Sequence, residues 1–395
     1  MRAGAAGAQC SHRAIGRRNT GAAAMRIEVG ASRLYDLQGF GQSVWLDCNH
    51  PRSLASPGFP HLIRDGIAGV DSNLVGLAAA YAEDSTYRES IAGLSAAGAT
   101  PRQIYEHLSI EDLRHAADCL RRVYNNSSGR DGYVSVDLAP SLADDADGTE
   151  SEAVHLWSVI DRPNIMIKVP ATDAGLLAMR RLISAGLNVN ATLIFGARRY
   201  RAVIDAYLGA LEKRVAEGLP LGSVASVASV FLGPIDSAVN RELDAIQQPA
   251  KAAHAKRLRG KAAVAVAQFV YQRYRSVVAS PRWQPLAAHH AKTQRLLWAS
   301  TDINDAADSD VKYVNDLIGR DTVMTMSLNT LSAYLDHGAA TPTLERNLLE
   351  VLALFGELEA LGIDLDRVST QLERENIDVI SAGVNTALTR LSPAA

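Results

Sequence analysis

The chain has 395 residues, of which 47% are hydrophobic and 21% charged, so it carries enough apolar material for one large core or two ordinary ones. A formal net charge of −3 and 6% aromatic residues provide neither the basic surface nor the stacking surface that nucleic-acid binding requires. The sequence contains no run of eighteen apolar residues, which argues against a membrane-spanning helix. Three cysteines without C-x-x-C spacing favour a reducing compartment, and we expect a cytoplasmic protein.

The first 24 residues differ from the rest of the chain. They contain four arginines, many small residues and no acidic residue, a composition that resembles a transit peptide. A second methionine, Met25, begins a more ordinary sequence. We expect residues 1–24 to be a disordered extension or the product of an upstream start codon, with targeting as the alternative.

From residue 40 onward, short apolar, β-branched runs alternate with long helical patterns. Strands that are buried on both faces lose the alternation of apolar and polar residues, and eight such runs separated by helices are typical of a parallel barrel. We therefore predict an α/β fold, a (β/α)8 TIM barrel over residues 25–340, with a doubly wound open sheet as the alternative. The eight predicted strands are Ser43–Cys48, Gly69–Ser72, Tyr133–Leu138, Ile165–Val169, Val189–Ile194, Val224–Phe231, Arg295–Ser300 and Thr322–Met326.

Two helices have clear sequence signals. The run Ser109-Ile-Glu-Asp112 reads as a capping box and predicts that a helix begins there. Apolar residues recur at helical spacing over Lys261–Tyr274. After the eighth strand, residues 341–395 predict two or three further C-terminal helices that pack on the barrel and lie across its mouth.

Lys168 is the only charged residue in the apolar run Ile165–Thr172. Burial disfavours a charged amine, so we expect the pKa of Lys168 to fall and the neutral amine to attack a carbonyl group. The structural alternative is a lysine whose stem lies along apolar surface while its ammonium group reaches water. Other polar residues favour the catalytic interpretation, because they also stand where predicted strands end and a barrel gathers those ends at one face: Asp47, Asn73, Asp137, Asn190, Thr192, Ser229 and Ser300.

Several motifs resemble, in order and spacing, the landmarks of the longer bacterial transaldolases: GQSVWLDCN, GIAGVDSN, DGYVSVDLAPSLADD, RPNIMIKVPAT, GLNVNATLIF, SVASVF and QRLLWAST. The resemblance extends from about residue 38 to about residue 390. It implies a class I aldolase barrel, a transferase of the pentose phosphate pathway that moves a three-carbon dihydroxyacetone unit from a ketose phosphate donor to an aldehyde acceptor. It also implies that no metal or other cofactor takes part, and that a homodimer is the usual assembly.

The resemblance implies four catalytic residues. Lys168 matches the Schiff-base lysine, and Asp47 matches the acid/base that handles the proton of the hydroxyl beside the scissile C–C bond. Thr192 matches the threonine that holds the catalytic water. Asp137 stands where the family has a glutamate that protonates the departing water, and its carboxyl group is shorter by one bond, about 1.5 Å.

The resemblance also implies a set of substrate-binding residues. Asn73 and Asn190 match asparagines that bind the hydroxyl groups of the enamine, and Ser229 matches a serine at the sugar end. Ser300 is a further binding candidate from its position alone, because it stands at the end of the seventh strand. Asp71 replaces a neutral hydroxyl residue, because this chain reads GVDSNL where the family usually reads GVTSNP.

The expected phosphate site differs from that of the family. Pro234 in FLGPID stands where the family has an arginine, and Asn304 stands where a lysine is expected in an STxTKNP-like loop. The same loop gains the acidic residues Asp302, Asp305 and Asp308, which repel a phosphate dianion.

Three interpretations of this loss remain open. In the first, another cation binds the phosphate and the enzyme is an ordinary transaldolase; the candidates are Arg198, Arg199, Lys312 and Arg320. In the second, the Schiff-base chemistry is kept, but the donor or acceptor lacks phosphate or carries an amine, as in a specialised pathway. In the third, the barrel is not catalytic and binds a sugar or a partner protein. Retention of a buried amine beside acid/base partners argues against the third.

Overall fold

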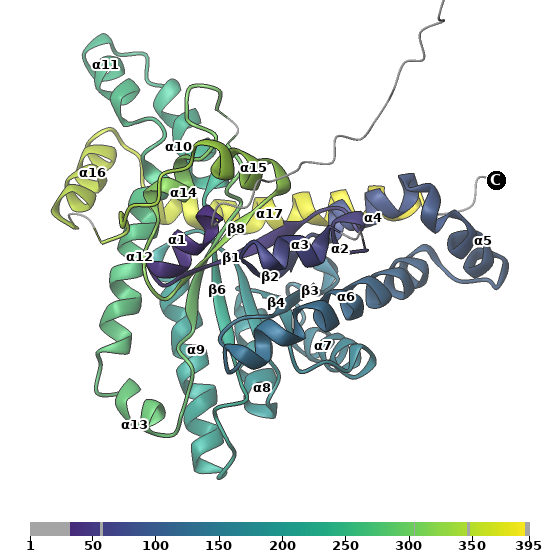
Figure 1. The fold of residues 1–395 in the computed structure, drawn as a ribbon. Helices are drawn as coiled ribbons and strands as arrows, with labels where there is room; N and C mark the ends of the chain where they lie inside the picture. The colour runs from purple at the N-terminus through teal and green to yellow at the C-terminus, as the bar shows by residue number, and fades with distance from the viewer. Residues whose placement is uncertain (1–31, 56–57, 304, 346–347, 392–395) are drawn as a thin grey trace, which may run out of the picture. The chain divides into compact units, whose positions relative to one another are not determined.

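The computed structural model describes residues 32–55, 58–303, 305–345 and 348–391, and within them eight parallel strands close into a barrel in chain order (Figure 1). Each strand pairs with the next, and the eighth pairs with the first. The predicted TIM barrel is therefore confirmed and the open sheet is excluded. The strands are β1 (Gln42–Cys48), β2 (Ile67–Ser72), β3 (Val134–Asp137), β4 (Ile165–Pro170), β5 (Val189–Ile194), β6 (Ser226–Phe231), β7 (Arg295–Ala299) and β8 (Thr322–Met326). The predicted extension, residues 1–24, lies outside the described residues.

Helices surround the strands and follow most of them in the chain (Figure 1). Short 3-10 turns, η1 (Ser85–Tyr87) and η2 (Pro140–Leu142), complete the regular structure of the described residues. The helices are α1 (Arg33–Gly39), α2 (Arg52–Ala55), α3 (Phe59–Arg64), α4 (Leu74–Glu83), α5 (Arg88–Ala96), α6 (Pro101–Asn126), α7 (Ala146–Ile160), α8 (Asp173–Ala185), α9 (Ala197–Ala216), α10 (Gly233–Asp244), α11 (Pro249–Leu258), α12 (Ala262–Val278), α13 (Trp283–Ala288), α14 (Lys312–Asp316), α15 (Leu328–His337), α16 (Leu348–Ala360) and α17 (Leu365–Thr389).

The predicted capping box at Ser109 is wrong. Helix α6 begins eight residues earlier, at Pro101, where Thr100 and Gln103 form a reciprocal capping box and the proline occupies the first turn. Ser109 is buried in the helix, and its hydroxyl donates to the carbonyl oxygen of Glu106. The earlier signal starts the helix because it satisfies the free amide groups of the first turn before the chain reaches Ser109.

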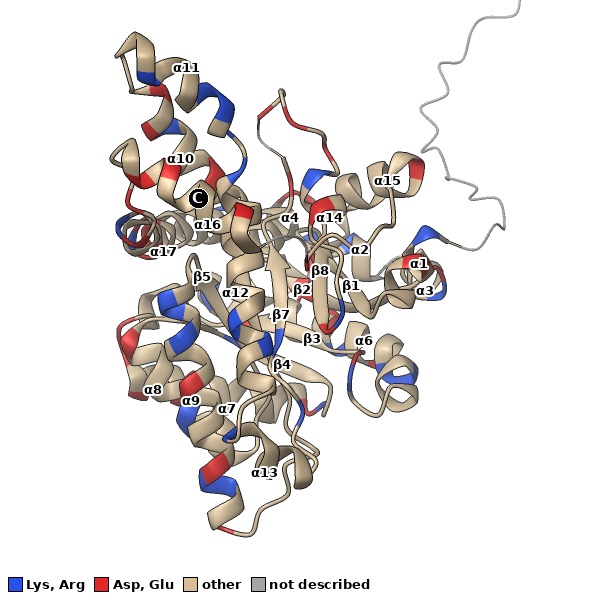
Figure 2. Cartoon of the chain, turned by 90° about the vertical axis from the view of Figure 1, so that its left-hand side faces the viewer, with Lys and Arg blue, Asp and Glu red and all other residues tan. Residues whose placement is uncertain are grey.

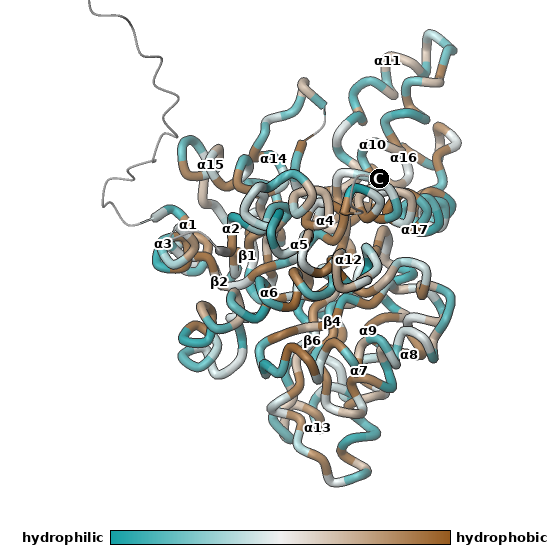
Figure 3. Tube along the Cα trace, turned by 90° about the vertical axis from the view of Figure 1, so that its right-hand side faces the viewer, coloured by the Kyte–Doolittle hydropathy of each residue, from teal (hydrophilic) through white to brown (hydrophobic). Residues whose placement is uncertain are grey.

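The interior of the barrel is layered. Near the amino-terminal ends of the strands, Arg295 donates to Ser43 and to Asp131. An apolar layer follows, in which buried side chains of alternate residues meet: Trp45, Met166, Val227, Leu297 and Val323. The carboxyl-terminal ends of the strands carry the third layer, which is polar. The brown strands β4 and β6 in Figure 3 lie among helices that are teal or white over much of their length.

Charged side chains lie mainly on the helices. Figure 2 shows blue and red residues along α8, α9, α10 and α17, whereas the strands are mostly tan. Charge buried inside the barrel is therefore the exception, and it occurs in the two polar layers. None of the helices among the described residues is long and apolar enough to cross a membrane.

Helix α17 runs across the carboxyl-terminal ends of the strands and packs against α4, α6, α10 and β5 (yellow in Figure 1). Glu373 of α17 forms a two-bonded ion pair with Arg199, at 3.1 and 2.8 Å, and Arg367 pairs with Glu242 at 2.6 Å. Helix α16 packs beside α12, where the rings of Phe269 and Phe355 meet edge to face. Of these two helices, α17 is the one whose side chains reach the polar layer.

Candidate active site

The strand register brings the predicted catalytic residues together. Asp47 on β1 stands opposite Asp71 on β2, and Asp137 on β3 stands opposite Lys168 on β4. Successive side chains of a strand point to opposite faces, so residues two apart share a face and these side chains meet inside the barrel. All lie in the carboxyl-terminal halves of their strands, toward the face where barrel enzymes carry their active sites.

Lys168 is almost completely enclosed, with 8% of its surface exposed. Its Nζ donates to the carbonyl oxygen of Ser72 at 2.7 Å. Two carboxylates also surround the amine: Asp137 Oδ1 lies at 3.1 Å and Asp71 Oδ2 at 3.4 Å. The side chain therefore does not extend to solvent, and the structural alternative of a surface-reaching ammonium group is excluded.

The expectation of a lowered lysine pKa is wrong. Burial lowers the pKa of Lys168, but the carboxylates of Asp137 and Asp71, with a smaller contribution from Asp47, raise it further than burial lowers it, so the net pKa lies above that of an ordinary lysine. The resting amine is therefore charged and must lose a proton before it can act as a nucleophile.

A hydrogen-bonded chain of polar side chains crosses the barrel beside Lys168. The Asn190 Nδ2 group donates to Asp71 Oδ1 at 3.2 Å and to Ser135 Oγ at 3.0 Å. The Ser229 hydroxyl donates to Asn190 Oδ1 at 2.6 Å. All four side chains are buried, so these contacts fix one orientation of the Asp71 carboxylate and of the Asn190 amide.

The pKa of Asp47 depends on burial and on the charged groups around it. Burial is the largest effect and raises the pKa of Asp47, Asp71 raises it further, Lys168 lowers it, and the net value is about 7. A carboxyl group with a pKa near neutrality can both take up and release a proton at pH 7, which suits a general acid/base.

A small cavity of about 70 Å³ opens beside Lys168. Its volume is sufficient for roughly two water molecules. Among the described residues, the Thr192 Oγ1 atom is buried without a hydrogen-bond partner, and Thr192 lines this cavity. A bound water would satisfy that hydroxyl. The lining also includes Asp137, Leu138, Pro140, Ala143, Pro170, Leu193, Phe231, Ile377 and Ile380.

The backbone is strained at the same place. Leu193 has a φ of +61°, in the left-handed region that branched residues rarely adopt, and the pairing of β5 with β6 shifts register between Ala191 and Ile194. Both Thr192 and Leu193 line the cavity. Strain of this kind persists where the surrounding structure enforces it, and it is concentrated at functional sites.

Two predicted binding residues lie outside this cluster. Asn73 is exposed and caps α4, where its Oδ1 accepts from the Gly76 amide at 3.1 Å. Ser300 follows β7 with a φ of +54° and is half-buried. Neither makes a contact with the Lys168 group among the interactions of the described residues, although both stand at the carboxyl-terminal face.

Four residues of the site are not predicted by the sequence: Ser72, Ser135 and two isoleucines of α17, Ile377 and Ile380. Ser72 accepts from Lys168 through its carbonyl oxygen and donates to Asp137 Oδ2 through its hydroxyl at 2.8 Å. Ser135 could have been found, because it precedes Asp137 by two residues and therefore shares its face of β3. No local pattern links Ile377 and Ile380 to a cavity formed by strands that lie far earlier in the chain.

Neither of the two positions expected to bind phosphate carries the cation usual in the family. Pro234 lies in the first turn of α10, and Asn304 lies outside the described residues. Asp302 accepts hydrogen bonds from Ser327 and Thr330 at the start of α15, at 2.6 and 2.5 Å. Asp305 accepts from Arg259 at 2.7 Å.

Three of the four replacement cations do not offer a free charge at the site. Arg199 binds Glu373 and Asp173, and Lys312 binds Asp236 at 3.2 Å and Asp308 at 2.8 Å. Arg320 precedes β8 and therefore stands at the amino-terminal face, opposite the site.

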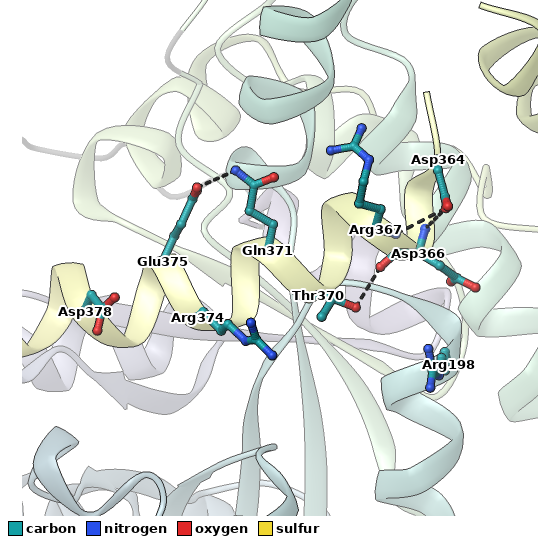
Figure 4. A pocket seen from close by; sticks show the side chains of 9 residues that line it. All are labelled: Arg198, Asp364, Asp366, Arg367, Thr370, Gln371, Arg374, Glu375 and Asp378. Atoms are coloured by element: carbon teal, nitrogen blue, oxygen red, sulfur yellow. Dashed lines mark hydrogen bonds between the residues drawn. The ribbon is translucent and has the colours of Figure 1, made fainter. Parts of the chain in front are cut away.

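Arg198 differs, because it is exposed and has no ion pair or side-chain hydrogen bond with the described residues. It lies at the start of α9, across a surface pocket from α17 (Figure 4). That pocket also contains two further arginines and four acidic residues, so its charge is mixed: Arg367, Arg374, Asp364, Asp366, Glu375 and Asp378.

Comparisons with known proteins agree with this geometry. The model of the family "Transaldolase/Fructose-6-phosphate aldolase" matches residues 44–390. A transaldolase of Saccharopolyspora erythraea is 41% identical over 349 residues, 88% of this chain and 93% of its own length. A transaldolase of Thiobacillus denitrificans is 40% identical over 358 residues, 90% and 98% of the two chains, and one of Neisseria gonorrhoeae is 37% identical over 345 residues, 87% and 95%. The chain belongs to the transaldolase/fructose-6-phosphate aldolase family.

Proposed function

We propose that this protein is a transferase that moves a three-carbon dihydroxyacetone unit from a ketose donor to an aldehyde acceptor through a Schiff base on Lys168. The observation that carries the proposal is the enclosed amine of Lys168, which two carboxylates contact at the edge of a cavity. A barrel that only binds a sugar has no need of such a perturbed charge cluster, and perturbed groups beside a cavity are typical of catalytic sites.

Each residue of the cluster has a distinct task in this proposal. Lys168 attacks the ketose carbonyl and forms an iminium ion, which accepts the electron pair of the breaking C–C bond. Asp47 removes the proton from the hydroxyl beside that bond. Asp137, helped by a water on Thr192, protonates the hydroxyl that leaves as the iminium forms.

The polar residues around the catalytic group hold the three-carbon unit. Asn190 and Ser229 are buried beside Lys168 and bind hydroxyl groups of the enamine, with Asp71 fixing the Asn190 amide. Asn73 and Ser300 lie farther out at the same face and contact the remainder of the donor or the acceptor. Helix α17 excludes water from the enamine until an aldehyde arrives.

We further propose that the donor and the acceptor are recognised without a phosphate group. Pro234 cannot supply a cation, Asp302 adds a carboxylate, and the cations Arg199 and Lys312 are already paired. A charge-assisted hydrogen bond to phosphate contributes roughly 1.5–3 kcal/mol, so its loss removes much of the preference for sugar phosphates. Neutral or amine-bearing sugars fit the surplus of carboxylates.

One observation favours a second candidate, the ordinary transaldolase of sugar phosphates with a rebuilt phosphate site. Arg198 is exposed, unpaired among the described residues, and placed at the start of α9 directly after β5. A cation at a helix N-terminus is suited to an anion. This candidate function requires that the attraction of Arg198 for phosphate exceed the repulsion from the four acidic residues of the same pocket.

Transfer of isotope separates these functions. Ketoses labelled with ¹³C at the first three carbons, both free and phosphorylated, are incubated with the protein and with free or phosphorylated aldehydes, and products are read by mass spectrometry. We expect the label to appear in a longer ketose, with free sugars used at rates comparable to those of sugar phosphates, and no transfer by Lys168→Ala. Exclusive use of sugar phosphates that Arg198→Ala abolishes would establish the rebuilt site. Absence of transfer to every acceptor would support the non-catalytic barrel.

A further inference from the structure

Two carboxylates touch the Lys168 amine, and they differ in what else they can reach. Asp137 lines the cavity, and 18% of its side chain is exposed. Asp71 stands opposite Ser135, two residues before Asp137 on β3, so it lies one layer deeper in the barrel. Its side chain is 9% exposed. Asp137 is therefore placed to contact a substrate in the cavity. Asp71 contacts Lys168 but does not line the cavity.

The surroundings of Asp71 aim one oxygen at the amine. Asn190 donates to Oδ1 at 3.2 Å, which leaves Oδ2 facing Lys168 Nζ at 3.4 Å. The Asn190 amide is itself fixed by Ser229 and Ser135. A carboxylate held this way has one oxygen oriented to exchange a proton with the lysine.

On the basis of the Schiff-base function proposed above, we propose that Asp71 is a further catalytic residue, the base that accepts the proton Lys168 must lose before it attacks the ketose. The N–H bond of the ammonium group breaks as an O–H bond forms at Asp71 Oδ2, which leaves a neutral amine and a carboxylic acid. The amine then forms the N–C bond and the carbonyl electron pair moves to oxygen. That oxygen leaves as water with two protons of the nitrogen, which the Asp137 carboxylate takes up and passes on in turn, and Asp71 returns its proton to the imine nitrogen to give the iminium ion. When the imine is hydrolysed, the same steps run in reverse and end as the proton returns from Asp71 to the lysine.

The charges around Asp71 support its role as the acceptor of the lysine proton. Burial raises the pKa of Asp71, Lys168 lowers it, Asp137 raises it, and the net pKa is above that of an ordinary aspartate, which makes Asp71 a better proton acceptor. The other charged groups facing this pair are Asp47 and, next to Asp47, Asp302. Because Lys168 is only 8% exposed, bulk solvent is a poor alternative acceptor.

The test measures how fast the imine forms as a function of pH. Wild-type protein, Asp71→Asn and Asp137→Asn are mixed with dihydroxyacetone at pH 6 to 9, and samples are quenched at intervals into borohydride at one fixed pH. The adduct on the Lys168 peptide is then counted by mass spectrometry. An internal proton transfer does not depend on bulk pH, so we expect a flat profile for the wild type.

Asp71→Asn should slow imine formation at least tenfold at pH 7, and its rate should rise with pH because solvent must now remove the proton. The matched variant Asp137→Asn should be slower than wild type but keep the flat profile. Asp71→Thr, which carries the hydroxyl usual in the family, repeats the test if the asparagine variant does not fold, and it should show the same rising profile.

Imine formation by Asp71→Asn that equals or exceeds the wild-type rate from pH 6 to 9 would overturn the inference, because the carboxylate would then only hold the lysine in its charged form. A wild-type protein that forms no adduct at any pH would instead contradict the proposed function itself. The two failures are therefore distinguishable.

Discussion

The barrel buries a cation near each of its ends, and the two cations differ in the number of carboxylates that face them. At the amino-terminal end, Arg295 is 5% exposed and donates to Asp131, Ser43 and the Arg130 carbonyl oxygen. One guanidinium group faces one carboxylate. At the carboxyl-terminal end, the single amine of Lys168 faces Asp71 and Asp137, with Asp47 close by.

The difference separates a structural cluster from a reactive one. The Arg295 cluster is balanced in charge, and both terminal guanidinium nitrogens donate hydrogen bonds, so it fixes the bottom of the barrel. The Lys168 cluster has more carboxylates than cations, a pKa near 7 at Asp47, and an unpartnered Thr192 hydroxyl beside a cavity. Proteins keep such imbalance where chemistry requires it. Burial of charge alone would not have distinguished the two ends.

The largest expected effect at the reactive end comes from Asp47→Asn. Removal of a general base costs about 10²- to 10⁴-fold in rate, so turnover should fall by that amount. The asparagine variant should still form the ketose adduct on Lys168, since in the proposed mechanism Asp47 acts after the imine has formed. The measurement compares kcat with the amount of borohydride-trapped adduct, and parallel loss of both would reassign Asp47 to imine formation.

The same residue sets an expected pH dependence. The base must be ionised, so the rate of C–C cleavage in the wild type should fall about tenfold per unit as the pH decreases below about 7. The folded-state pKa of Asp47 is raised, so its contribution to stability is largest at low pH and is lost as the pH rises through about 7. Asp47→Asn should therefore increase Tm at pH 8 and leave it nearly unchanged at pH 4.

At the structural end, Asp131→Ala should lower stability without changing that pH dependence. It leaves the buried Arg295 unpaired, which costs about 3–5 kcal/mol. The matched control is Asp118→Ala, which removes an ion pair with Arg162 whose side chains are 53% and 28% exposed and which should cost about 0–1 kcal/mol. Denaturant unfolding gives both values. An equal, small cost for the two variants would mean that the Arg295 cluster does not fix the barrel.

A smaller effect is expected from Pro234→Arg, which restores the cation usual in the family to the first turn of α10. One charge-assisted hydrogen bond corresponds to about tenfold to a hundredfold in recognition. The ratio of kcat/KM for fructose 6-phosphate over free fructose should rise by that factor. If the ratio is already high in the wild type and does not rise, phosphate is bound by other residues.

The smallest effect is expected from helix α17, which lies over the cavity beside Lys168. Ile377→Ala should admit water to the enamine and raise the release of free dihydroxyacetone several-fold relative to transfer, because the side chain lines the cavity. Leu349→Ala on α16 is the control, since that leucine is 77% exposed. Product ratios from labelled donor provide the measurement, and similar ratios for both variants would show that α17 does not exclude water.

The strands and the lysine could be predicted from the sequence because both are local signals. Runs such as Val189–Ile194 and Thr322–Met326 have the bounds that β-branched composition indicates, and Lys168 stands out from its own apolar neighbours. The direction of the lysine pKa could not be predicted, because Asp71 is 97 residues away and acts only through the register of the barrel. The pairing of Arg199 could not be predicted either, because its partner Glu373 follows 174 residues later in the chain.

The most direct test of the account is the location of a trapped adduct. The protein is incubated with a competent ketose, reduced with borohydride and digested with trypsin, and the peptides are read by mass spectrometry. We predict a three-carbon adduct on the peptide that contains Lys168, no adduct in Lys168→Ala, and an undiminished adduct in Asp131→Asn at temperatures where that variant is folded. Labelling that persists in Lys168→Ala would contradict the claim that the reaction takes place at the lysine of the carboxyl-terminal end.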